Sequence, residues 1–474
     1  MNKLKLFIEN FLVYGLGGIA NKVIPLIMVP IVTRLMPGTE YYGISDLSNT
    51  LVQLCSAVAV MGMYDAMYRM FFEKDDISFK QDVCSTAIVF TAISSVCIFA
   101  IMLIFKEPVA NLFFKSAEYI SMVYLSALAT LVGATNQIIA APTRMQNKRK
   151  IFLTINVSTA ILSYSIAIPL ILRGHYLIAL PLSAFLSNLI VEVVYLILNR
   201  SWFVPKKFNS ALLKQLLMIA IPLLPNFLIY WVFNSSNQLM ITNILGVAEA
   251  GIYSVGAKLG HVSQLIYTAF AGGWQFFAFS VMKEKDQVES NSKIFEYLGV
   301  ISFVATAFMC AWSYPIYKVL FAEQYHAGYI VAPYLFFAPL LQMLFQVAAN
   351  QFLVVKKTWP NLFILSAGAI LSVVLNLFLI PRIGIEGAGI ATLIGYTASD
   401  IICVLVLKKM KLMVISGRFV LCAAAVVFYL VVWRAFFATS ALISTGIALG
   451  VVLIYLFLYR ADLMKLVKMV TKRG

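Results

Sequence analysis

Long apolar stretches separated by short polar loops run along the whole chain. A stretch of about 20 apolar residues is long enough to cross the roughly 30 Å hydrocarbon core of a membrane as an α-helix. Fourteen such stretches can be placed without a long structureless loop, centred near Lys22, Leu54, Ser94, Ala129, Leu162, Ser187, Leu224, Leu259, Val304, Leu341, Ala369, Leu393, Val427 and Leu449. The pattern therefore predicts an all-α, polytopic membrane protein with fourteen transmembrane helices.

Several short motifs recur at a nearly constant distance along the chain. Gly43 and Gly251 are 208 residues apart, Gly174 and Gly384 are 210 apart, and the pairs Asn136-Gln137 and Asn350-Gln351 are 214 apart. A repeated unit of six spans has an even number of helices, so the two copies are parallel and related by an axis along the membrane normal. The repeat predicts two pseudo-symmetric six-helix lobes.

The polar segment 199–215 separates the two copies, and we expect it to lie on the membrane surface as a linker. The predicted N-terminal lobe covers residues 1–207 and the C-terminal lobe residues 208–410. Residues 411–474 then add helices thirteen and fourteen and a cytoplasmic tail.

Composition supports a membrane protein and excludes a soluble one. The chain is 62% hydrophobic and 12% charged, with a mean hydropathy of +0.91, unlike a soluble domain of 474 residues. The net charge of +16 does not indicate a nucleic-acid partner, because the cations lie in short loops and are not gathered on one soluble face. The same loops favour attraction to anionic membrane lipid.

The distribution of the cations predicts the topology. With a cytoplasmic N-terminus, the cytoplasmic loops and tails hold 26 Lys and Arg residues, and the opposite side holds seven. This asymmetry follows the positive-inside rule. Both termini are therefore predicted to lie in the cytoplasm.

Three cations fall within or at the end of a span: Lys22, Arg69 and Lys258. A charge at the centre of a span costs about 3 kcal/mol on insertion scales, so Lys22 is expected to face a cavity and not lipid. Pro25 and Pro30 follow it, and each removes a backbone donor, which predicts a kinked first helix. Together the three cations predict a positively charged cavity that attracts an anion.

Four acidic residues lie within or near spans: Asp46, Asp65, Glu192 and Asp400. Asp65 and Arg69 are spaced i,i+4, which predicts an ion pair near the cytoplasmic mouth of the cavity. Asp46 is an alternative partner for Lys22. Glu192 and Asp400 occupy nearly equivalent places in the repeat, and we favour snorkelling to the membrane surface over ion coupling for them.

The sequence does not show the clustered polar residues that are typical of an enzyme active site. The outer loops carry isolated glutamates and no acidic pair, and His175, His261 and His326 are far apart. The six cysteines lie in apolar segments without a C-x-x-C motif, so they are expected to be packing residues. No catalytic residue, no metal site and no cofactor is predicted.

Four segments resemble the polysaccharide-transport flippases, within the superfamily that also contains multidrug exporters and the lipid II flippase. They are GLGGIANKVIPLIMVPIVTRLMP, EYYGISDLSNTLVQL, MGMYDAMYRMFFEKDD and ANQFLVVKKTWPN. The resemblance implies a fourteen-span, two-lobed fold that moves a polyprenyl-pyrophosphate-linked oligosaccharide, such as an O-antigen unit, across the bacterial inner membrane by alternating access. It also implies that Lys22 and Lys258 bind substrate in the cavity and that Arg69 lies at the cytoplasmic gate.

Two alternatives stay open at this point. A multidrug or metabolite exporter of the same superfamily would use a carboxylate-lined cavity, and a membrane glycosyl polymerase or transferase would need a large outer loop with paired acids. The resemblance further implies a polysaccharide polymerase and glycosyltransferases as partners. The coupling could be to a proton gradient, a sodium gradient or the membrane potential.

The topology can be tested by cysteine accessibility in a cysteine-free variant. Because both tails carry the cationic signal, a cysteine at Gly474 should react only after the membrane is permeabilised. Labelling of this position by an impermeant reagent in intact cells would overturn the assignment.

Overall fold

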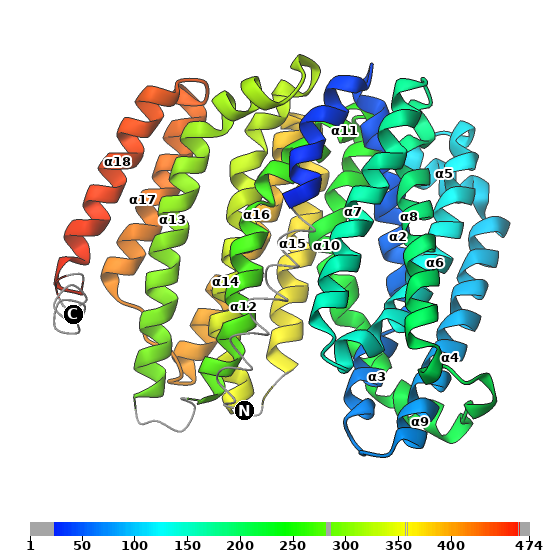
Figure 1. Ribbon diagram of the computed structural model, residues 1–474. Coiled ribbons are helices and arrows are strands. Elements are labelled where there is room, and N and C mark those ends of the chain that lie inside the picture. The colour runs from blue at the N-terminus through cyan, green and yellow to red at the C-terminus, as the bar shows by residue number, and fades with distance from the viewer. Residues whose placement is uncertain (1–22, 281–285, 356, 358, 463, 465–474) are drawn as a thin grey trace. The chain divides into compact units, whose positions relative to one another are not determined.

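The computed structural model describes residues 23–280, 286–355, 357, 359–462 and 464, and none of these lies in a β-strand (Figure 1). A helix covering Val23–Leu35 comes first. The next helices are α2 (Thr39–Val60), α3 (Met63–Phe71), α4 (Ile77–Ile104), α5 (Lys106–Phe114), α6 (Ile120–Met145), α7 (Arg149–Leu172), α8 (Tyr176–Asn199), α9 (Ser210–Ala220) and α10 (Leu224–Ile244). They are followed by α11 (Val247–Gly260), α12 (Ser263–Ser280), α13 (Gln287–Leu320), α14 (Ala332–Val354), α15 (Trp359–Ile383), α16 (Ile385–Lys409), α17 (Gly417–Val432) and α18 (Ala441–Leu458). The predicted all-α class is confirmed.

Many of these helices can span a membrane. Within the described residues, 11 are long and apolar enough, or 12 if the bent pair α2 and α3 forms one span. The helix Val23–Leu35 and the helices α11 and α12 cover the predicted first and eighth spans but do not meet the same criterion. The multi-pass character is confirmed, and the count of fourteen stays a prediction.

The chain forms two compact units. The first unit contains the residues up to Ser254 and Asn376–Ile385, and the second contains Val255–Leu375 and the residues from Glu386 onward. These units are groups of packed residues, whereas the predicted lobes 1–207 and 208–410 and the added segment 411–474 come from the sequence repeat. The predicted lobe boundaries therefore stay predictions.

Helix α6 is central to the first unit, where it packs against α2, α4 and α8 (Figure 1). Small side chains such as Ala59, Ala87 and Ala134 are fully buried among these helices, together with Met63 and Met67. Small residues let helix backbones approach closely, which is how helices gain packing energy in a lipid environment.

A sharp break separates α2 from α3. Met61 and Gly62 both have left-handed backbone angles, with φ values of 51° and 75°, and the two helices meet at a bend of 46°. Glycine adopts this conformation without strain. Gly62 also lies against the backbone carbonyl of Ala220 in α9, where a side chain would not fit.

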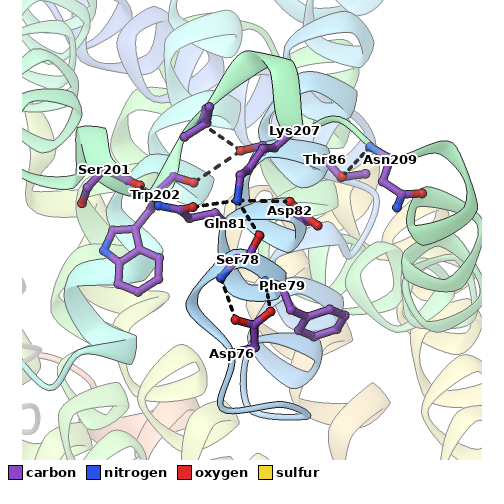
Figure 2. Close-up of polar contacts among 12 residues, drawn as sticks. Asp76, Ser78, Phe79, Gln81, Asp82, Thr86, Ser201, Trp202, Lys207 and Asn209 are labelled. Carbon is purple, nitrogen blue, oxygen red and sulfur yellow. Dashed lines mark hydrogen bonds and ion pairs between the residues drawn. The ribbon is translucent and has the colours of Figure 1, made fainter.

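The linker between α8 and α9 is fastened to the first turns of α4 (Figure 2). The Lys207 ammonium donates to Ser78 Oγ at 2.7 Å and to Gln81 Oε1 at 2.9 Å, and the Gln81 amide donates to the Ser201 carbonyl at 2.8 Å. The backbone N–H of Asn209 donates to Thr86 Oγ1 at 3.1 Å. The linker is thus bonded to α4 along much of its length.

In the second unit, α17 and α18 lie beside α13 (Figure 1). Glu296 of α13 is buried and accepts hydrogen bonds from Ser416 Oγ at 2.8 Å and from the Tyr459 hydroxyl at 3.1 Å. Burial and the negative charge of Glu296 raise the pKa of Tyr459, so its hydroxyl remains a donor. At the other end of the pair, Arg434 donates to Glu386 Oε1 at 2.6 Å. Buried carboxylates therefore hold the added helix pair at both ends.

Helices α2 and α11 cross in direct backbone contact within the first unit. A Cβ atom at Gly43 would overlap the Val247 carbonyl, and one at Gly251 would overlap the Thr39 carbonyl. These two glycines are the pair that the repeat matches at a spacing of 208 residues. Glycine is therefore required at both positions for the helices to meet as they do.

Replacing Gly251 with alanine should destabilise this crossing. The added methyl group must push α2 and α11 apart, which we expect to cost about 1–3 kcal/mol, as for overpacked sites in general. Thermal unfolding of the purified protein measures the effect. The matched control is Gly446→Ala in α18, where a new Cβ would have no neighbour within 4 Å; equal stability of both variants would contradict the requirement for glycine.

Candidate functional site

A cavity of about 370 Å³ lies in the first unit at the break between α2 and α3. Its polar lining consists of Gln53, Ser56, Tyr64, Asp65 and Gln137. These residues come from α2, α3 and α6, and Phe227 of α10 adds an aromatic wall. We call this space the α2–α3 cavity.

The local backbone explains why the α2–α3 cavity exists. The left-handed residues Met61 and Gly62 end α2 and redirect the chain, so the following turn does not continue the helix. On α6, Gly133 leaves space opposite Ser56, because a Cβ there would lie 3.3 Å from the serine oxygen. The Ser56 hydroxyl is buried and has no hydrogen-bond partner among the described residues.

The chemistry of this lining suits a neutral polar guest. Glutamine amides offer both donors and acceptors, hydroxyl groups do the same, and a carboxylate adds strong acceptors. Such groups next to an aromatic ring match the hydroxyls and the apolar face of a sugar. The lining itself contains no cation, so it does not by itself provide a pyrophosphate site.

The cation beside the α2–α3 cavity is Arg144, in the last turn of α6. Its guanidinium donates to the Tyr64 hydroxyl at 2.9 Å and lies 5.3 Å from the centre of the Phe152 ring. Its positive charge also acts on Asp65. The i,i+7 spacing of Arg144 from Gln137, which puts both residues on one face of α6, is the signal that could have identified this cation.

The sequence predicted Arg69 as the ion-pair partner of Asp65. Asp65 and Arg69 are both exposed on α3, and no ion pair within 4.0 Å joins them in the described part of the chain. The i,i+4 spacing allows such a pair, but Arg69 lies outside the lining of the cavity that Asp65 enters. The gate role of Arg69 stays a prediction.

The other predicted site residues lie at separate places. Lys22 is outside the described residues. Lys258 is half-buried in α11 and belongs to the second unit, and Asp46 is half-buried in α2. The charge of Asp46 acts on Tyr253 of α11. The substrate-binding roles of Lys22 and Lys258 stay predictions.

A buried polar network that the sequence did not indicate joins α2, α10 and α11 beside the glycine crossing. Thr50 Oγ1 donates to Gln238 Oε1 at 3.0 Å, and the Gln238 amide donates to Ser254 Oγ at 2.9 Å. The neighbouring Asn237 amide donates to the Tyr253 hydroxyl at 2.8 Å. The polar pair Asn237-Gln238 in the middle of an apolar span was the available signal.

Metal-binding chemistry is not suggested by the side chains that the structure describes. Within those ranges, no three His, Cys, Asp or Glu residues are grouped so that they could hold a metal ion.

Comparison with protein families gives one match. Residues 31–329 match the model of a family described as polysaccharide biosynthesis protein. No curated protein matches the chain by sequence.

Solved structures share the fold. A lipid II flippase, MurJ, in an inward closed conformation is similar with a TM-score of 0.69 and 15% identity, over 95% of this chain and 99% of that chain. An inward-facing multidrug resistance MATE family transporter of the MOP superfamily is similar with a TM-score of 0.59 and 13% identity, over 83% of this chain and 98% of that chain. A Vibrio cholerae MATE transporter, VcmN, is similar with a TM-score of 0.58 and 12% identity, over 86% of this chain and 96% of that chain. At these identities the similarity establishes the fold.

Charge exchange can test which cation acts on Asp65. Because Arg144 is bonded to Tyr64, the residue before Asp65, Asp65→Arg combined with Arg144→Asp should recover more stability than the single variants imply. We expect a coupling of up to about 1 kcal/mol, the range of exposed charge pairs, in a double-mutant cycle of thermal unfolding. The matched control exchanges Asp65 with Arg69 and should show no coupling; the reverse order of the two couplings would contradict the assignment.

Proposed function

The chain belongs to the polysaccharide biosynthesis protein family, and from this premise we propose that it is a flippase for a lipid-linked oligosaccharide. Its substrate would be a polyprenyl-pyrophosphate-linked oligosaccharide, moved from the cytoplasmic to the outer leaflet for cell-surface polysaccharide synthesis. The family match over residues 31–329 is the observation that carries the proposal. The fold it shares with a lipid II flippase supports it.

The polar groups of the protein support a substrate with two different ends. The α2–α3 cavity offers amides, hydroxyls and an aromatic ring, which suit sugar hydroxyls. Arg144 beside it suits a pyrophosphate. A guest with a sugar end and a diphosphate end would use both kinds of group.

Alternating access would require the crossing of α2 and α11 to open. The two helices occupy equivalent places in the predicted repeat and meet through Gly43 and Gly251. Their backbones pack closely at these glycines, and α10 links them through neutral hydrogen bonds from Thr50 to Gln238 and from Gln238 to Ser254. Backbone packing and neutral hydrogen bonds separate at a lower cost than a buried ion pair, which makes this crossing a suitable gate.

Drug export is the second candidate, because multidrug transporters share the fold. A cationic drug would need an uncompensated carboxylate. The carboxylate of the α2–α3 cavity, Asp65, is acted on by Arg144. A glycosyl polymerase is less well supported, since acid–base catalysis on a sugar needs two facing acids and the lining of this cavity contains one.

A flipping assay tests the proposed function. The protein would be reconstituted in proteoliposomes with a polyprenyl-pyrophosphate-linked oligosaccharide that is radiolabelled in the sugar. Movement between leaflets is measured by protection from an impermeant glycosidase. Transfer that needs the intact lipid carrier supports the flippase, whereas transfer of a cationic dye and not of the glycolipid would support drug export.

We propose that the protein acts in the bacterial inner membrane, with both termini cytoplasmic. Glycosyltransferases would supply its substrate and a polysaccharide polymerase would consume the product. These partners follow from the chemistry of the substrate, which must be assembled on the lipid before transfer and polymerised after it.

Lys22 should be the most sensitive cation in this mechanism. A lysine at mid-membrane is unfavourable alone and gains a diphosphate partner when substrate arrives, so its charge favours the loaded state. Lys22→Ala should abolish polymer export at normal protein level, and Lys22→Arg should keep part of it.

Polymer export and protein level are measured together for the Lys22 variants. If Lys22 instead pairs with Asp46 to hold the first two spans together, Lys22→Ala lowers the protein level and Asp46→Asn restores it. Normal export by Lys22→Ala would exclude the binding role.

A further inference from the structure

Two carboxyl groups lie inside membrane-spanning helices at positions that the repeat relates. Glu192 in α8 and Asp400 in α16 are 208 residues apart, the same offset as Gly43 and Gly251. The two acidic residues are only 9% and 7% exposed. Both are therefore enclosed by protein, and neither extends to the membrane surface as the snorkelling interpretation predicted.

The two carboxyl groups differ in their hydrogen bonding. Glu192 Oε1 accepts a hydrogen bond of 2.6 Å from Thr135 Oγ1 of α6. At the 214-residue offset of the Asn-Gln pairs, the position equivalent to Thr135 is Ala349, which has no hydroxyl to donate. Consistently, both oxygens of Asp400 are buried and have no partner in the described part of the chain. The carboxyl group of Glu192 therefore has a hydrogen-bonding partner, and that of Asp400 has none among the described residues.

Two contacts of α16 with neighbouring segments involve titratable or charged side chains, and both lie far along the helix from Asp400. Helix α14 contacts α16 where Tyr334 lies against Gly389, and Arg434 contacts it at Glu386. These contacts are 11 and 14 residues before Asp400, which is roughly 16–21 Å along a helix at 1.5 Å per residue. The Tyr334 hydroxyl is itself bonded to Glu386 at 2.9 Å.

On α16 itself, the nearest charged residues are Lys408 and Lys409, more than two turns beyond Asp400. Helix α15 contacts α16 through the hydrogen bond from Ser399 Oγ to the Ile364 carbonyl, at 3.4 Å. Its one charged residue, Arg382, lies 18 residues beyond Ile364, at the other end of α15. The titratable group that interacts with Asp400 is Cys403, one turn further along α16 and fully buried.

We propose that Asp400 is a proton-binding site and that it couples transport to a proton gradient; this rests on the proposed flippase function. A bare carboxylate enclosed by protein costs several kcal/mol, whereas a neutral carboxyl group costs far less. The conformation described here therefore holds Asp400 with a proton on one carboxyl oxygen. A conformation that exposes the group to water releases the proton by breaking that O–H bond.

A proton fits this site better than a metal cation does. Hard cations need several oxygen ligands around them. The described surroundings give Asp400 no hydrogen-bonding partner at all, and the nearby Ser399 hydroxyl is already bonded to main-chain carbonyls. Protonation requires no second ligand, so the isolation of Asp400 is compatible with a proton alone.

Proton binding at Asp400 would bias the conformational equilibrium. The enclosed state binds the proton tightly and the water-exposed state binds it weakly, so a proton gradient shifts the populations by this difference in affinity. One coupled proton is worth up to about a tenfold change per pH unit of gradient. Glu192, which has a hydrogen-bonding partner in Thr135, does not provide the same contrast.

Infrared spectroscopy of the reconstituted full-length protein tests proton binding directly. The C=O stretching band of a protonated carboxyl group should be present in the native protein and lost in Asp400→Asn, which keeps the side-chain volume. The matched control is Glu192→Gln, whose amide oxygen can still accept from Thr135 and which should retain the band. A band unchanged by Asp400→Asn would overturn the proposal.

Transport in the same vesicles tests coupling. An imposed pH gradient should change the rate of glycolipid transfer in the native protein and in Glu192→Gln, and should have no effect on Asp400→Asn. Undiminished gradient dependence in Asp400→Asn would overturn the coupling role. If the glycolipid is not moved by any form but Asp400→Asn still removes the infrared band, the flippase function fails and the proton site stands.

Discussion

The hydrogen bonding of polar side chains inside the membrane-spanning helices is the constraint on which the rest of the structure depends. Lipid offers no partner to a buried polar group, so each one must find its partner within the protein. Glu296 and Glu386 meet this demand by holding the last two helices through hydroxyl and guanidinium groups. The network from Thr50 through Gln238 to Ser254 does the same for α2, α10 and α11. The pattern of satisfied groups thus defines which helices stay together.

Several buried polar groups in the described part of the chain do not follow this rule, and two of them bear on function. Ser56 faces the α2–α3 cavity with a free hydroxyl, and Asp400 has two carboxyl oxygens without partners among the described residues. An unsatisfied buried polar group costs free energy, which a ligand or a proton can recover by completing the bonding. The first exception supports a sugar-binding role, and the second supports proton coupling.

Backbone contact provides the second organising element. At the crossing of α2 and α11, two glycines allow main-chain carbonyls to approach where any side chain would collide. The same two helices carry the uncharged hydrogen bonds of the buried network, so close packing and neutral polar contacts act together there. Separating such contacts costs less than breaking the buried charged contacts that hold α17 and α18 to α13.

The sequence by itself determined the all-α class, the membrane location of the helices, the repeat and the family resemblance, because hydropathy and spacing are local properties of the chain. It also identified Asp65, which lines the α2–α3 cavity. The tertiary structure alone shows that Arg144 is bonded to Tyr64 beside the α2–α3 cavity, that Gly43 meets Gly251, and that Asp400 has no hydrogen-bonding partner among the described residues while Glu192 is bonded to Thr135. These facts depend on which side chains of helices far apart in sequence come together. The helical pattern restricts such pairs to certain faces, but the packing of the helices selects among them.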